Sequence, residues 1–277
     1  MDSYVVIGNP VSHSKSPEIH SLFAKQTGQQ LDYSALFAEL DKFEETAAHF
    51  FSAGGKGANV TLPFKEEAFR LADDLSAEAE FAGAVNTLSV DNTGGLRGHN
   101  TDGIGLVTDI CSNHGGSLAN KNVLVLGAGG AARGILQPLL KQGPAVLTIA
   151  NRTASKAEAL AEIVQSAGNP DMQTEVAGSG YIGLGGRKYD WIINATSASL
   201  QGEVPPISTF LLAEETWCYD LMYAKKPTPF CQWAKEAGAK KSIDGLGMLV
   251  EQAAESFLTW RGVRPETSEV IKLLRAG

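Results

Sequence analysis

The stretch that decides the fold of the second half of the chain is Val123-Leu124-Val125-Leu126-Gly127-Ala128-Gly129-Gly130-Ala131-Ala132. Its apolar start predicts a buried strand, and the pattern G-x-G-x-x-A that follows opens a helix running to Gly143. Gly127 allows the tight turn, Gly129 lets a pyrophosphate approach the backbone, and Ala132 lets helix and strand pack closely. The unpaired N–H groups of the helix N-terminus bind phosphate. We therefore predict a dinucleotide site, with a glycine-rich turn that holds no ligand as the alternative.

The end of the next predicted strand, residues 145–150, selects the cofactor. An NAD site usually places Asp or Glu there, because a carboxylate bonds the ribose 2′-hydroxyl. This chain has Asn151-Arg152-Thr153 instead, with Lys156 one helical turn further on. A guanidinium can bind a 2′-phosphate bidentately, whereas a carboxylate would repel it. The sequence thus favours NADP, and Asn151 to Thr153 also suit a turn and helix cap, a role that does not conflict with binding.

The rhythm of apolar strands and amphipathic helices predicts an α/β fold with two domains. In the second half, helices separate the predicted strands 123–126, 145–150, 189–195, 217–220 and 239–243, which indicates a parallel sheet covered on both faces. We expect an N-terminal α/β substrate-binding domain at residues 1–102, with the C-terminal helices of residues 240–277 packing back on it. Residues 103–239 are expected to form a Rossmann-type, doubly wound dinucleotide-binding domain.

Composition excludes several classes of protein. The 277 residues are 43% hydrophobic and 19% charged, and 23 basic against 31 acidic residues give a net charge of −8. Acidic charge without a basic run argues against a nucleic-acid partner. The three cysteines and five histidines show no metal-ligand spacing, so no metal is expected. No apolar run is long enough to span a membrane, and we expect a cytoplasmic protein with a small-molecule substrate, either monomeric or homodimeric.

Polar clusters occur where predicted elements of the first half begin or end. In residues 12–17, Ser16 is expected as a helix N-cap with Pro17 at the first helical position. Ser14 and Ser16 also suit a ligand carboxylate, because helix dipole and hydroxyl donors act in the same direction.

Lys65 follows a predicted strand and lies near the start of a helix, where cations are disfavoured. That position suits a lysine that gives up a proton, although a solvated surface lysine is the alternative. Asp102 is either the N-cap of the next helix or a functional carboxylate. Asn86 interrupts an apolar strand, and a buried amide needs partners from the backbone or from a ligand.

Taken together, these clusters and the glycine-rich turn carry a resemblance. The motifs that carry it, in chain order, are Ser14-x-Ser16, Asn59-Val60-Thr61-x-Pro63-x-Lys65, Gly83-Ala84-Val85-Asn86-Thr87, Asn100-Thr101-Asp102-Gly103, residues 127–132, Asn151-Arg152-Thr153, Asn194-Ala195-Thr196-Ser197, Tyr219-Asp220-Leu221-Met222-Tyr223 and Asp244-Gly245-Leu246-Gly247-Met248-Leu249-Val250-x-Gln252-Ala253. In this order and spacing the chain resembles the shikimate dehydrogenase family over nearly its whole length.

The resemblance implies roles for individual residues. Ser14, Ser16 and Tyr223 would hold the substrate carboxylate. Thr61, Asn86, Asp102 and Gln252 would bind ring hydroxyls. Lys65, paired with Asp102, would be the proton donor or acceptor at the reacting oxygen. The implied cofactor-binding residues are Gly127, Ala128, Gly129, Gly130, Ala131, Asn151, Arg152, Thr153, Ala154, Ser155, Lys156, Leu221, Gly245 and Met248, of which Met248 would lie against the nicotinamide.

The activity that the resemblance implies is reversible reduction of 3-dehydroshikimate to shikimate with NADPH, a step of the shikimate pathway that leads to chorismate and the aromatic amino acids. A quinate/shikimate dehydrogenase on the same scaffold is the alternative. The serine pair and Arg152 argue against this alternative, as they do against a quinate dehydrogenase. Retention of both Lys65 and Asp102 argues against an inactive NADP-binding regulator.

Overall fold

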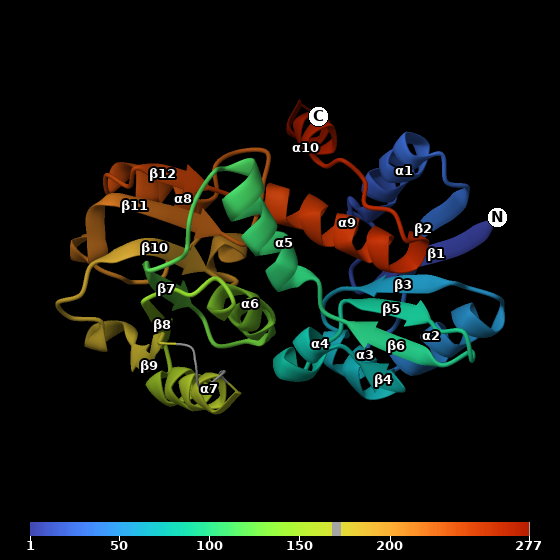
Figure 1. Cartoon of the computed structure of the whole chain (residues 1–277), viewed down its shortest axis with the longest axis horizontal. Coiled ribbons are helices and arrows are strands. Elements are labelled where there is room, and N and C mark those ends of the chain that lie inside the picture. Colours follow the sequence, from blue (N-terminus) through green and yellow to red (C-terminus); the bar gives the residue numbers. More distant parts are fainter. Residues whose placement is uncertain (168–172, 277) are drawn as a thin grey trace. The chain divides into compact units, whose positions relative to one another are not determined.

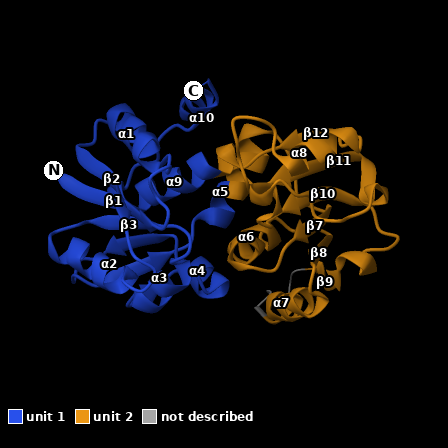
Figure 2. Cartoon of the chain, turned by 180° about the vertical axis from the view of Figure 1, so that it is seen from behind, with its two compact units in different colours: residues 1–105, 249–277 blue, residues 106–248 orange. Residues whose placement is uncertain are grey.

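The computed structural model describes residues 1–167 and 173–276, which form two compact units. Unit 1 comprises Met1–Gly105 and Leu249–Gly277, and unit 2 comprises Leu106–Met248 (Figure 2). Each unit is built on a six-stranded sheet with helices, which confirms the predicted α/β class. The functional division predicted at residues 102 and 240 remains a prediction, because compactness alone does not say what a unit binds.

Unit 1 holds a mixed sheet with the strand order β2-β1-β3-β5-β6-β4. Its elements are β1 (Asp2–Gly8), α1 (Ser16–Thr27), β2 (Leu31–Phe37), α2 (Phe43–Ser52), β3 (Gly57–Val60), α3 (Lys65–Leu71), β4 (Asp74–Leu75), α4 (Ala77–Ala82), β5 (Thr87–Val90), β6 (Leu96–His99), the start of α5 (Asp102–Thr108), most of α9 (Leu246–Arg261), and α10 (Ser268–Ala276). Strands β1, β2 and β3 pair in parallel, and β5 and β6 form an antiparallel hairpin.

Helices cover both faces of this sheet (Figure 1). Val5 and Ile7 of β1 share a buried cluster with Phe43 of α2 and Phe64, whose rings stack at 5.0 Å. On the opposite face, where α1 and α9 lie, Tyr4 packs against Trp260 of α9 with ring centroids 4.8 Å apart. The alternation of side chains along β1 therefore gives unit 1 two apolar layers.

Two local predictions for unit 1 were wrong. The pattern of apolar residues predicts a helix over residues 66–74, but α3 ends at Leu71, because Ala72 is extended and the amide of Asp73 donates to the carbonyl of Leu96 at 2.8 Å. Pairing of β4 with β6 thus outweighs helix propensity. The N-cap of α1 is Lys15 rather than Ser16, which is the first helical residue and is buried.

Unit 2 holds an all-parallel sheet with the strand order β12-β11-β10-β7-β8-β9. Its elements after α5 are the π-helical turn η1 (Asp109–Asn113), β7 (Asn122–Leu126), α6 (Gly130–Leu140), β8 (Val146–Asn151), α7 (Ala154–Ala167), β9 (Glu175–Gly180), η2 (Tyr181–Gly183), β10 (Tyr189–Asn194), η3 (Ala198–Gln201), η4 (Thr209–Leu211), β11 (Leu212–Asp220), α8 (Pro229–Glu236) and β12 (Lys241–Ile243). Chain order reverses between β7 and β10, and ligands bind at such switch points, beyond the carboxyl ends of the strands.

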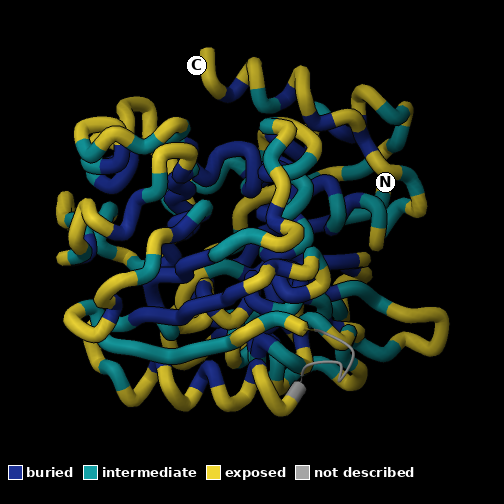
Figure 3. The backbone as a smooth tube through the Cα atoms, turned by 60° about the vertical axis from the view of Figure 1, so that its left-hand side comes forward, coloured by how far each residue is buried: buried dark blue, intermediate teal, exposed yellow. Residues whose placement is uncertain are grey.

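Burial follows the sheets, with buried residues along the central strands and exposed residues on the outer faces of the helices (Figure 3). Leu124 to Leu126 of β7 are fully buried, as their unbroken apolar run predicts. Strand β9 escaped prediction because its sequence, Glu-Val-Ala-Gly-Ser-Gly, combines a partly exposed edge position with two glycines. Within the described ranges, no helix has the length and apolar content required to cross a membrane.

A buried histidine in unit 1 makes folding stability depend on pH. His20 is fully buried and stacks on Tyr33 at 4.2 Å, and burial lowers its pKa from the ordinary value of 6.5 to about 3. Below pH 6.5 the unfolded chain takes up a proton that the folded chain excludes. Stability should therefore fall with falling pH, by up to about 1.4 kcal/mol per pH unit.

Denaturant unfolding at several pH values between 5 and 7 measures this contribution. A His20→Phe variant should show a shallower decline than the parent. A Phe23→Leu variant removes packing beside the same ring without removing the titrating group. It should lower stability equally at every pH, and identical pH slopes for parent and His20→Phe would contradict the prediction.

Candidate active site

Lys65 is placed in unit 1 by the junction between β3 and α3. Phe64, which precedes it, is fully buried, and the carbonyl of Lys65 accepts a hydrogen bond from the amide of Val85 at 2.9 Å. Lys65 is the first residue of α3, which confirms its predicted place near the start of a helix. Its backbone is thus anchored on both sides while its side chain remains 26% exposed.

Asp102 is the first residue of α5, three residues after the end of β6. The preceding Asn100 is buried, donates to the carbonyl of Ala84 at 3.0 Å and accepts from the amide of Asp102 at 3.2 Å. These contacts fix the start of α5 relative to the strands of unit 1.

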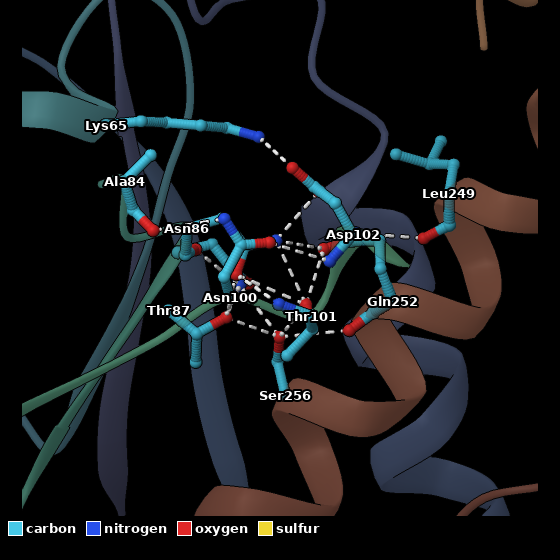
Figure 4. Close-up of polar contacts among 11 residues, drawn as sticks. Lys65, Ala84, Asn86, Thr87, Asn100, Thr101, Asp102, Leu249, Gln252 and Ser256 are labelled. Atoms are coloured by element: carbon cyan, nitrogen blue, oxygen red, sulfur yellow. Dashed lines mark hydrogen bonds and ion pairs between the residues drawn. The ribbon is translucent and has the colours of Figure 1, made fainter. Parts of the chain in front are cut away.

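Lys65 and Asp102 form an ion pair across these two junctions. The Lys65 Nζ lies 2.6 Å from Asp102 Oδ2, and the Asp102 side chain is only 13% exposed (Figure 4). An ammonium carries three donors, so the bond to Asp102 leaves others for a ligand. The pair brings together the two residues predicted to be catalytic.

Asn86 organises the polar groups beneath the ion pair. Its Nδ2 donates to Asp102 Oδ1 at 2.8 Å, and its Oδ1 accepts from the backbone amide of Thr101 at 3.0 Å. The side chain is 3% exposed, so these bonds satisfy an amide that would otherwise be costly to bury. Both oxygens of Asp102 are thereby engaged, one by Lys65 and one by Asn86.

Helix α9 closes the cluster from the C-terminal part of the chain. Gln252 Oε1 lies 3.3 Å from Thr101 Oγ1 and 3.4 Å from Asn86 Nδ2 (Figure 4). One turn later, Ser256 accepts from Asn59 Nδ2 at 3.0 Å. The contribution of Ser256 was missed from sequence, yet its i,i+4 spacing from Gln252 on one helix face was the available signal.

The predicted carboxylate-binding serines lie at the start of α1. Ser14 Oγ accepts from the amide of Ser16 at 3.2 Å, and Ser16 is 7% exposed. Thr61 follows β3, and its amide donates to Ile7 at 3.0 Å. These three residues belong to unit 1, whereas Tyr223 belongs to unit 2. Tyr223 is 37% exposed, so its hydroxyl is accessible to a ligand.

In unit 2, the glycine-rich turn leaves room for a ligand. Gly127 has φ +113°, and its amide donates to the carbonyl of Ala150 at 2.7 Å. Gly129 is the N-cap of α6 and has no side-chain cap, and a Cβ added at Gly129 or Gly130 would meet nothing within 4 Å. Open space beside unclaimed N–H donors fits a pyrophosphate. The turn therefore fits the predicted dinucleotide.

The other predicted cofactor residues follow neighbouring strands. Leu126 is paired with Ala150 in β8 and, on the other side, with Asn194 in β10. The exposed Arg152 therefore lies beside the glycine-rich turn, and α7 begins there as well, because the carboxyl ends of parallel strands share one sheet edge.

Leu221, Gly245 and Met248 occupy the same edge of unit 2, past β11 and β12. A Cβ on Gly245 would overlap the Leu221 carbonyl, so the two backbones are in close contact. Leu221 and Met248 are each 8% exposed.

Three family models match the chain. Residues 6–88 match the shikimate dehydrogenase substrate binding domain, residues 109–200 match shikimate / quinate 5-dehydrogenase, and residues 245–275 match the shikimate 5′-dehydrogenase C-terminal domain.

Full-length relatives agree with these matches. A shikimate dehydrogenase (NADP(+)) of Hahella chejuensis is 53% identical over 277 residues, which cover 100% of both chains. The crystal structure of an Ael1 enzyme from Pseudomonas putida is similar with a TM-score of 0.92 and 48% identity, covering 99% of this chain and 98% of that one. The shikimate 5-dehydrogenase of Thermus thermophilus, solved in complex with NADP(H) and shikimate, has a TM-score of 0.86 and 32% identity over 100% of this chain and 99% of that one.

Replacing Gly129 with Ala tests the nucleotide cradle. Gly129 has φ −92°, which Ala adopts readily, and its Cβ would meet open space, so stability should change by no more than about 0.5 kcal/mol. Dinucleotide affinity should nevertheless fall roughly tenfold or more, about 1.4 kcal/mol, because the Cβ occupies the ligand's space.

Fluorescence titration with NADPH measures that loss. Gly185→Ala is the matched control, because Gly185 is exposed and also has open space around it. Wild-type affinity in Gly129→Ala would show that the turn does not hold the dinucleotide.

Proposed function

The chain belongs to the shikimate dehydrogenase family, and we propose that it catalyses the reversible NADPH-dependent reduction of 3-dehydroshikimate to shikimate. The family predicted from the sequence motifs is therefore confirmed. The observation that carries the proposal is the 2.6 Å ion pair between Lys65 and Asp102, set in a cluster of amide and hydroxyl groups suited to a polyhydroxylated ring.

The cofactor supplies the hydride that the carbonyl carbon accepts. Residues 127–131 would hold its pyrophosphate, residues 151–156 its phosphorylated ribose, and Leu221, Gly245 and Met248 its nicotinamide half. Within residues 151–156, Arg152 supplies the cation that a 2′-phosphate requires, and the exposed Lys156 adds a second positive charge. The absence of a carboxylate at the end of β8 supports NADP over NAD.

Lys65 acts as general acid in the reduction. As the carbonyl carbon gains hydride, negative charge develops on oxygen, and the Lys65 ammonium donates a proton there. Asp102 accepts a hydrogen bond from that ammonium and so orients it. In the reverse direction the neutral amine takes the proton from the hydroxyl, so the same two atoms serve oxidation.

Recognition of the ring is assigned to the remaining polar groups. Asn86, Thr61 and Gln252, with Asp102, bind the ring hydroxyls. Ser14 and Ser16 hold the carboxylate at the N-terminus of α1, where the helix dipole favours an anion. The role of Tyr223, a residue of unit 2, stays a prediction. The chain's cytoplasmic location and its state as a monomer or homodimer stay predictions.

Oxidation assays separate this activity from its nearest alternative. Shikimate and quinate are each offered with NADP⁺ or NAD⁺, and nicotinamide absorbance is followed. We expect kcat/KM for shikimate with NADP⁺ to exceed every other combination by roughly a hundredfold, about 2.7 kcal/mol of transition-state binding. Comparable rates with quinate would instead identify a quinate/shikimate dehydrogenase.

Removing the Lys65 ammonium should impair the chemical step. A Lys65→Ala variant is expected to lose between about 100-fold and 10,000-fold in kcat, the range of general acid–base catalysis, with little change in KM for shikimate. Lys65→Arg retains a positive charge beside Asp102 but yields its proton poorly, so it should be similarly inactive. Substantial turnover by Lys65→Arg would mean that Lys65 contributes charge rather than a proton.

A further inference from the structure

A buried carboxylate that the proposed reaction does not use lies in unit 2. Asp109, the first residue of η1, is 1% exposed. Its Oδ1 accepts from Asn113 Nδ2 at 2.8 Å, and its Oδ2 accepts from the Tyr219 hydroxyl at 2.7 Å. His114 Nε2 lies 3.5 Å from Oδ2. A buried carboxylate is costly unless paired, so this arrangement holds Asp109 in one position.

Tyr219, near the end of β11, connects this carboxylate to the Asp244–Met248 segment. Its side chain is fully buried, and burial together with the Asp109 carboxylate raises its pKa well above the ordinary range. The phenol therefore stays protonated, and its O–H donates a hydrogen bond to Asp109. The backbone N–H of Met248 acts in the opposite direction on the pKa of Tyr219, because an N–H near the phenol oxygen favours its charged form.

The segment itself is packed tightly on these groups. A Cβ on Gly247 would overlap the Asp109 carboxylate, so that carboxylate lies directly against the glycine. Two residues earlier Gly245 contacts the Leu221 carbonyl in the same way, and Ile243 pairs with Tyr219 between β12 and β11. Between Ile243 and Met248 the backbone is thus held at three points. Ile243 pairs with β11, Gly245 contacts the Leu221 carbonyl, and Gly247 contacts the Asp109 carboxylate.

We propose that Asp109 and Tyr219 are positioning residues that set the place of Met248, and through it the place of the nicotinamide ring. This inference rests on the proposed function, in which Met248 lies against that ring. Neither residue touches the reacting atoms, since they act through the backbone of Gly247 and Met248. Hydride transfer is sensitive to such placement, because an error of about 1 Å can cost on the order of 100-fold in rate.

Tyr219→Phe tests the inference, because it keeps the buried ring and removes only the hydroxyl that donates to Asp109, the carboxylate packed against Gly247. Tyr189→Phe is the matched control. Tyr189 is a buried tyrosine of β10 in the same sheet, and its hydroxyl donates to Thr148 at 3.1 Å. Each change removes one buried hydroxyl, so thermal unfolding should show similar losses of stability.

The two variants should differ in function. For Tyr219→Phe we expect kcat to fall roughly 10- to 100-fold with KM for shikimate nearly unchanged. NADPH affinity should fall, while affinity for adenosine 2′,5′-bisphosphate, which lacks the nicotinamide half, should match the parent. Tyr189→Phe should match the parent in all these measurements.

Equal behaviour of the two variants would overturn the inference. So would an equal loss of adenosine 2′,5′-bisphosphate affinity in Tyr219→Phe, because the damage would then extend beyond the nicotinamide half. If Tyr219→Phe does not fold, Asp109→Asn keeps the side-chain volume against Gly247 and is measured in its place, with the same criteria. An inactive parent would contradict the proposed function instead, and the two binding titrations would still test the positioning role.

Discussion

The ion pair between Lys65 and Asp102 depends on how two chain segments leave the sheet of unit 1. Lys65 begins α3 after β3, and Asp102 begins α5 after β6, yet their side-chain atoms lie 2.6 Å apart. Asn86 holds the other carboxylate oxygen at 2.8 Å, which prevents Asp102 from turning away. A carboxylate fixed on both oxygens gives the ammonium one preferred direction, and that is the requirement of an acid that must meet a particular oxygen.

In unit 2, the direction of the strands determines where the predicted cofactor-binding residues lie. All its strands run parallel, so the turns that follow β7, β8, β10 and β11 gather at one edge. Several residues predicted to bind the cofactor at this edge are glycines, which leave the backbone accessible to a ligand. Gly127, Gly245 and Gly247 face close neighbours, whereas Gly129 faces open space.

Sequence patterns predicted the α/β class because strand and helix periods are local properties of the chain. The predictions of secondary structure were wrong or incomplete where pairing with a strand distant in the sequence determines the local structure. Residues Asp73 and Asp74 leave the helical pattern to pair with β6, and the glycine-bearing β9 is held by its neighbour β8. The start of α1 at Ser16 rather than Pro17 is a shift of one residue, yet it converts a predicted cap into a buried helical serine.

The site was predictable to a similar degree. Motif spacing singled out Lys65, Asp102 and Asn86 individually, but their contact depends on strand order that no short pattern contains. Ser256 and Asp109 were missed because residues that bind their side chains, Asn59 and Tyr219, lie far away in the sequence. Asp109 acquires meaning only when Tyr219, 110 residues away, donates to it.

The most direct test is a crystal structure with shikimate and NADPH bound together, a pair that is stable because both are in the reduced form. We expect the Lys65 ammonium within hydrogen-bond distance, about 3 Å, of the ring hydroxyl that is oxidised, with Asp102 still bound to it. An ammonium directed into solvent, with another side chain on that hydroxyl, would contradict this expectation.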